Sequence, residues 1–127
     1  RCDAAGNPWI TGFSSGLIAR YDNAQRRFDT WPLPVRSDTP YALNVDRARH
    51  VVWVNGNQSD TLLRFVIASE TWKVYPLARQ RSFTRDIEID EDGAVYTSIS
   101  NFPAWQIEDA QPTLVRVREA GANLASP

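Results

Sequence analysis

Residues 51–65 read VVWVNGNQSDTLLRF, and residues 7–21 read NPWITGFSSGLIARY. Each stretch has an apolar segment around a tryptophan, then a short polar turn, then a second apolar segment that ends in an arginine and an aromatic residue. The two tryptophans, Trp9 and Trp53, are 44 residues apart. Recurrence at a fixed interval of this size predicts stacked copies of one structural unit.

Other landmarks keep the same interval. Arg20 and Arg64 are 44 residues apart, and the WPL of residues 31–33 returns as the YPL of residues 75–77. Three independent pairs therefore give one period.

A third copy begins with RDIEIDEDGAVYTSIS at residues 85–100. In it Tyr96 takes the tryptophan position and Arg116 takes the arginine position. We expect one partial domain over residues 1–127, with repeats at about 1–34, 40–77 and 84–118 and a tail at 119–127.

Turn residues divide the complete second copy into four short runs rich in β-branched and aromatic residues. Such runs predict β-strands, and the Gly, Asn, Asp, Ser and Pro between them predict chain reversals. The four predicted strands are 41–46, 50–56, 61–66 and 71–76. An apolar stripe at helical spacing is absent from the sequence, so we expect essentially no helix.

Four antiparallel strands in every forty-odd residues are typical of a β-propeller blade. The sequence therefore predicts an all-β fold, a β-propeller fragment of about three four-stranded blades. We expect the first blade to lack most of its innermost strand and the last to lack its outer strand. Trp9, Trp53 and Tyr96 are predicted to fill the space between blades.

The length of 127 residues corresponds to just under three repeats. Closed propellers have about four to eight blades. We expect the N-terminus to be a truncation, and the ring to be closed by the remaining blades of a longer chain or by a second copy.

The phrases LIARYDNAQRRFDTWPLP at 17–34 and TPYALNVDRARHVVWVNGN at 39–57 carry a resemblance to a known family. They resemble the blade repeat of the streptogramin B (virginiamycin B) lyase-like propellers. The resemblance covers nearly the whole chain.

The resemblance implies an activity. In that family a cyclic peptide closed by an ester is opened by elimination, with a Mg²⁺ ion and a histidine base among acidic residues on the propeller rim. His50 is the one histidine of this sequence. It falls in the predicted turn between the first and second strands of a blade, which opens on the opposite face, so it does not match the family's catalytic histidine.

Composition excludes several partners. A net charge of −1 from 14 basic and 15 acidic residues gives no electrostatic footprint for nucleic acid or an anionic membrane. No apolar stretch approaches the roughly 20 residues that span a bilayer. Cys2 is the single cysteine, which excludes an internal disulfide and a cysteine-rich metal site.

The third copy contains an insertion. Trp53 and Arg64 are 11 residues apart, whereas Tyr96 and Arg116 are 20 apart, so nine residues are added around NFPAWQIEDAQP at 101–112. The insertion should overhang the rim, where Trp105 either contacts a ligand or covers a blade edge.

We expect the same rim to carry residues from the starts of inner strands and the ends of second strands. The candidate ligand-binding residues are Tyr41, Asn55, Asn57, Arg85, Ser100, Asn101 and Trp105. Arg85 would either clamp a carboxylate or phosphate or neutralise its acidic neighbours Asp86 and Glu88.

Two other patterns have structural explanations. The arginine shared by all copies is expected to pair with strand-end carboxylates or carbonyls. The acidic run Asp90-Glu91-Asp92-Gly93 predicts a hairpin turn, not a metal site.

Two functions follow from the sequence. The first is a lyase of the family type, with Mg²⁺ as a possible cofactor through the resemblance. The second is a non-catalytic propeller that binds a small molecule, a peptide or a partner protein through its rim.

Overall fold

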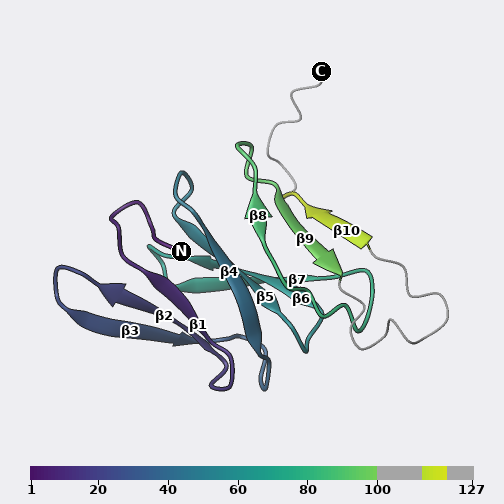
Figure 1. The fold of residues 1–127 in the computed structure, drawn as a ribbon, viewed down its shortest axis with the longest axis horizontal. Helices are drawn as coiled ribbons and strands as arrows, with labels where there is room; N and C mark the ends of the chain where they lie inside the picture. Colours follow the sequence, from purple (N-terminus) through teal and green to yellow (C-terminus); the bar gives the residue numbers. More distant parts are fainter. Residues whose placement is uncertain (100–112, 120–127) are drawn as a thin grey trace.

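In the computed structural model, residues 1–99 and 113–119 are described, and these residues form three antiparallel β-sheets and no helix (Figure 1). Consequently the described part of the chain contains no helix of the length and apolarity that crossing a membrane requires. The three sheets follow one another along the chain and fan out from a shared inner edge, where β1, β4 and β8 lie side by side.

Each sheet is a consecutive run of strands joined by short turns. The first consists of β1 (Trp9–Gly12), β2 (Leu17–Asp22) and β3 (Arg27–Pro32). The second consists of β4 (Pro40–Asp46), β5 (Val51–Gly56), β6 (Thr61–Val66) and β7 (Thr71–Pro76). The third consists of β8 (Glu88–Ile89), β9 (Val95–Ile99) and β10 (Thr113–Val117).

These sheets are blades of a β-propeller, and their composition confirms the predicted fold class. The second blade has all four strands. The first has three strands and an isolated bridge between Cys2 and Pro8, and the third has three strands in the described residues. The three sheets do not close into a ring.

Strand β5 is buried along its whole length because a blade covers each of its faces. Val52 and Val54 belong to one apolar cluster with Trp9 of the first blade. Val51 and Trp53 belong to a second cluster, which includes residues of the third blade. Since alternate residues of a strand face opposite sides, one continuous apolar run supplies both inter-blade cores.

The two clusters place Trp9 and Trp53 between blades, whereas the third predicted residue, Tyr96, is half-buried and belongs to neither cluster. Trp9 is 1% exposed and stacks on Trp31 with ring centroids 5.2 Å apart. Trp53 is 3% exposed and lies 5.2 Å from Tyr75. Both tryptophans therefore fill inter-blade space, as the repeat predicts.

The shared arginine has the predicted structural role in each blade. Arg20 pairs with Asp29 at 2.8 Å, and its guanidinium lies over the rings of Trp9 and Trp31. Arg64 pairs with Glu119 at 3.6 Å.

In the third blade, Arg116 lies 3.8 Å from Asp90 and over the ring of Tyr96. All three arginines thus pair with carboxylates, although the acid that pairs with Arg64 comes from the neighbouring blade.

Candidate functional site

The antiparallel order of the strands sorts the loops between two ends of the molecule. We call one end the rim; it is formed by residues 13–16, 33–39, 57–60 and 77–85. The turns at 23–26, 47–50 and 67–70 lie at the opposite end. His50 is in one of these opposite turns, as predicted, so the only histidine of the sequence is separated from the rim by the length of β5.

Three exposed side chains from successive blades meet on the rim. Phe13 lies in the turn after β1, Tyr41 near the start of β4, and Arg85 just before β8. The Phe13 and Tyr41 rings are 6.2 Å apart in an edge-on arrangement, and the Arg85 guanidinium lies 4.7 Å from the centre of the Tyr41 ring. Phe13 is 47% exposed and Tyr41 45% exposed.

This trio offers two kinds of recognition on one surface. Exposed aromatic faces stack on planar or apolar groups, and a guanidinium carries its donors in a fixed fork that fits a carboxylate or phosphate. Sequence reasoning selected Tyr41 and Arg85 but missed Phe13. The 44-residue repeat could have identified Phe13 as a rim residue, because Phe13 is 44 residues before the candidate Asn57.

Asn55 is placed at the rim end of β5 but is fully buried. Its Oδ1 accepts hydrogen bonds from the backbone N–H groups of Tyr41 at 3.0 Å and Ala42 at 2.8 Å, while its Nδ2 donates to the Thr84 carbonyl at 2.8 Å. The register of β4 shifts between Pro40 and Leu43, and this irregularity frees the two N–H groups that Asn55 satisfies. Its amide therefore joins two blades, and its ligand-binding role stays a prediction.

Asn57 lies directly on the rim in a half-buried position. Its backbone N–H donates to the Thr39 carbonyl at 3.1 Å, and its side-chain Oδ1 is buried without a hydrogen-bond partner in the described part of the chain. The remaining candidates, Ser100, Asn101 and Trp105, and the inserted segment around them fall outside the described residues.

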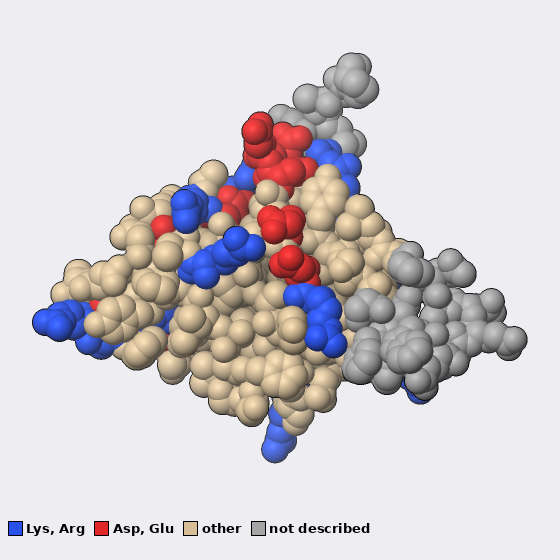
Figure 2. Space-filling view, viewed as in Figure 1, with Lys and Arg blue, Asp and Glu red and all other residues tan. Residues whose placement is uncertain are grey.

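Acidic side chains gather along β8 and the turn that follows it, and Figure 2 shows them as a red column with basic side chains beside it. Glu88 pairs with Arg1 at 3.5 Å, and Asp86 accepts a hydrogen bond from the N–H of Ile87. The Gly93 N–H donates to the Asp90 carbonyl at 3.0 Å, which confirms the predicted hairpin turn.

The Asp90 carboxylate is hydrogen-bonded to residues of its own blade. Burial pushes the pKa of its carboxyl up, but hydrogen bonds from the Ala94 N–H and the Tyr96 hydroxyl outweigh this and hold the pKa below its usual value. Within residues 1–99 and 113–119, no three His, Cys, Asp or Glu side chains are grouped as a metal site would require. We assign no metal-dependent step to these residues.

No protein-family model and no curated protein matches the sequence. Comparison with solved structures does find matches. A virginiamycin B lyase from Staphylococcus aureus matches with a TM-score of 0.70 and 15% identity, over 96% of this chain and 41% of that chain. A streptogramin B lyase matches with a TM-score of 0.72 and 19% identity, over 94% of this chain and 39% of that one.

A third match is a catalytically inactive histidine-to-alanine variant of the S. aureus virginiamycin B lyase with quinupristin. Its TM-score is 0.70 and its identity 16%, over 94% of this chain and 41% of that chain. The chain therefore has the β-propeller fold of the streptogramin B lyases, of which it spans 39% to 41% of the length.

Proposed function

We propose that the rim of this propeller segment binds a ligand through Phe13, Tyr41 and Arg85. The observation that carries the proposal is the meeting of these three exposed side chains, one from each of three successive sequence repeats. Exposed aromatic residues beside an arginine are the groups most often responsible for binding energy on protein surfaces. A small molecule or peptide that combines an aromatic or apolar group with an acidic one fits this chemistry.

A second candidate is the lyase reaction of the family that the fold resembles. The observation in its favour is the likeness to three structures whose names are those of lyases or an inactive lyase variant. The reaction breaks the alkyl C–O bond of the ester, removes a proton from the adjacent carbon, forms a C=C double bond between the two carbons and releases the carboxylate. A base must reach that proton, and His50 lies at the wrong end of its blade, so the base and any Mg²⁺ ligands would come from elsewhere in the protein.

Ring closure is part of this proposal. In the described residues, one face of the first blade and one face of the third have no neighbouring blade, and a closed propeller would cover both faces. The remaining blades of a longer chain, or a second copy of this one, would complete the ring. Native mass spectrometry of the intact protein distinguishes the two, because a second copy gives a mass of twice 14.4 kDa and a longer chain gives a larger single-chain mass.

The rim proposal is tested by binding of quinupristin, the molecule present with one of the matched structures. Isothermal titration of the intact protein should show binding that Arg85→Ala and Phe13→Ala each weaken about tenfold or more. Arg47→Ala is the matched control. Arg47 is also an exposed arginine, but it lies in the turn at the opposite end of β4, so its loss should leave affinity unchanged.

The same incubation separates binding from catalysis. Elimination opens the ring without changing the mass, whereas hydrolysis adds one water. Chromatography followed by mass spectrometry should therefore reveal a new peak of unchanged mass if the lyase reaction occurs. Binding without a new peak favours the non-catalytic function, and equal affinity in the Arg85→Ala, Phe13→Ala and Arg47→Ala variants would remove the rim proposal.

A further inference from the structure

Two turns on the rim, residues 13–16 and 57–60, occupy equivalent places in successive blades and differ at their last residue. Gly16 and Asp60 are 44 residues apart, and both have left-handed backbone conformations, with φ of 62° and 54°. The Gly16 carbonyl accepts a hydrogen bond from the Leu33 N–H at 2.9 Å, and the Asp60 carbonyl accepts one from the Leu77 N–H at 2.8 Å. The two residues thus occupy the same place in successive blades.

The loops that these two turns contact are equivalent as well. Ser37 and Arg81, again 44 residues apart, have φ of 63° and 55°. In the later loop, the Asp60 carboxylate accepts hydrogen bonds from the backbone N–H of Arg81 at 2.8 Å, the N–H of Ser82 at 2.7 Å and the Ser82 hydroxyl at 2.6 Å. Successive N–H groups around a left-handed residue form a concave anion site, and Asp60 fills it.

The earlier loop has the same left-handed residue at Ser37 but receives no carboxylate from the turn at Gly16. A Cβ added at Gly16 would lie 3.1 Å from the Asp38 carbonyl oxygen, so a side chain at this position would point at the loop. Among the described residues the Ser37 N–H has no acceptor, and the Asp38 N–H reaches the Val35 carbonyl at a long 3.3 Å. These are the equivalents of the two N–H groups that Asp60 binds.

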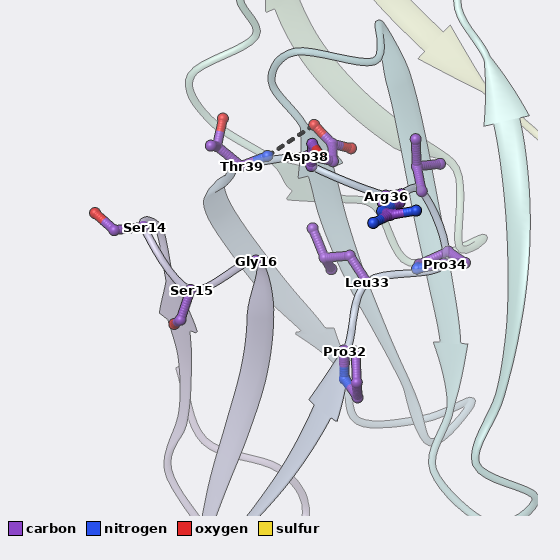
Figure 3. Close-up of a pocket in the computed structure, with 11 residues that line it drawn as sticks. Ser14, Ser15, Gly16, Pro32, Leu33, Pro34, Arg36, Asp38 and Thr39 are labelled. Atoms are coloured by element: carbon purple, nitrogen blue, oxygen red, sulfur yellow. Dashed lines mark hydrogen bonds between the residues drawn. The ribbon is translucent and has the colours of Figure 1, made fainter.

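An open pocket lies beside Gly16. It has a volume of about 530 Å³ and lies between the β1–β2 turn and the loop that leads into β4 (Figure 3). Its lining includes the serines of the turn, Ser14 and Ser15, and the cation Arg36.

The Asp38 carboxylate is hydrogen-bonded elsewhere. Its Oδ1 accepts from the N–H groups of Thr39, Gln58 and Ser59, and its Oδ2 accepts from the Ser59 hydroxyl at 2.6 Å. These bonds hold it against the β5–β6 turn of its own blade. Hydrogen bonds to a carboxylate satisfy its charge locally, and Arg36 adds a positive charge on the pocket side.

We propose that this pocket binds the carboxylate of a ligand in the position that the Asp60 carboxylate occupies in the next blade. The ligand carboxylate accepts hydrogen bonds from the Ser37 and Asp38 N–H groups, with Arg36 at the mouth. This site is distinct from the Phe13, Tyr41 and Arg85 surface and does not depend on the function proposed for it.

The test is a titration of the intact protein with acetate, followed through the backbone amide resonances of Ser37 and Asp38. Acetamide, a neutral molecule of the same shape, is the reference at matched ionic strength. We expect saturable shifts of the two resonances with acetate and none with acetamide. An absence of saturation with acetate, or equal responses to both molecules, would overturn the proposal.

Variants then locate the site. Gly16→Asp supplies the missing carboxylate internally and should weaken acetate binding at least about tenfold. Gly6→Asp is the matched control, because Gly6 also has a positive φ, of 82°, and a Cβ there would meet nothing within 4 Å. It adds the same charge away from the pocket and should leave acetate affinity unchanged.

The converse variant, Asp60→Gly, should create a second acetate response at the Arg81 and Ser82 amides. It keeps the proposal testable even if Gly16→Asp does not fold. Acetate binding that persists in folded Gly16→Asp, or an Asp60→Gly variant whose Arg81 and Ser82 amides ignore acetate, would contradict the equivalence on which the proposal rests.

Discussion

The first and second blades solve the same electrostatic problem in different ways. Arg20 in the first blade lies directly across the β2–β3 ladder from Asp29, and the two pair at 2.8 Å. The equivalent of Asp29 in the second blade is Lys73, which lies directly across from Arg64. Like charges in directly opposite positions of a sheet destabilise it, so the second blade needs an acid from elsewhere.

Glu119 supplies that acid from the segment after β10. Its carboxylate pairs with Arg64 at 3.6 Å and Lys73 at 3.1 Å, and it accepts a hydrogen bond from the Tyr75 hydroxyl. The first blade is thus neutralised from within, whereas the second is neutralised by the third. The acid that pairs with the arginine can therefore come either from the same blade or from a neighbouring one. In the second case, the ion pair forms only when the two blades are associated.

The largest effect on stability should come from the tryptophan that lies across the ladder from the shared arginine, as Trp53 does from Arg64. Trp53→Ala removes a 3% exposed side chain from the core between the second and third blades, and we expect it to cost about 3 to 5 kcal/mol of unfolding free energy. Urea-induced unfolding of the intact protein measures this. Val74→Ala, on an exposed face of β7, is the control and should be close to neutral. A nearly neutral Trp53→Ala would contradict the blade alignment.

An exchange of charges tests the comparison directly. Glu119→Ala leaves Arg64 and Lys73 facing each other and should cost about 1 kcal/mol, because Lys73 and Glu119 are partly exposed and screened by water. Lys73→Asp recreates the arrangement of the first blade. In the Lys73→Asp background Glu119→Ala should therefore cost nothing measurable, and a double-mutant cycle gives the coupling. Equal costs of Glu119→Ala in both backgrounds would show that Glu119 does not substitute for the missing Asp.

The smallest effect is a dependence on pH. The hydrogen bond from Tyr75 holds the pKa of Glu119 below its ordinary value of 4.5, opposed by burial and assisted by Lys73 and Arg64. An acid whose pKa is lower in the folded state stabilises the fold above its unfolded pKa, and this stabilisation is lost as the pH falls through the folded value. Urea midpoints at about pH 7 and about pH 3 should therefore differ less in Glu119→Gln than in the unchanged protein. An identical difference would mean that Glu119 gains nothing from its partners.

Much of the fold was predictable because the chain repeats. The second blade's strands were predicted at 41–46, 50–56, 61–66 and 71–76, and they are observed within one residue of these bounds. The hydrophobic pattern and the turn residues predicted where the strands lie, and the 44-residue interval predicted which strands belong to one blade. The third blade differs from the second in its inner strand, because β8 pairs with β9 only over Glu88–Ile89. Asp86 bonds instead to the Ile87 N–H through its own side chain, and the Thr97 hydroxyl donates to the Asp86 carbonyl.

Only part of the candidate site could be predicted from the sequence. Position along a strand indicates which end of the blade a residue occupies, so Tyr41 and Arg85 could be assigned to the rim. Position along a strand does not indicate whether a polar side chain is already hydrogen-bonded to backbone groups. Asn55 looks like a ligand-facing amide in the sequence, but the irregularity in β4 that it satisfies arises from strand pairing and leaves no local mark.

The burial of β5 on both faces has a consequence for strand alignment. In a half-exposed strand, a slip of one residue moves apolar side chains into water, and this penalty fixes the register. In β5 the same slip would exchange one apolar face for another, since the run before Asn55 is apolar on both sides. Asn55 is therefore the residue that makes a slipped alignment costly, because its fully buried amide finds partners in β4 and at Thr84 in one register alone.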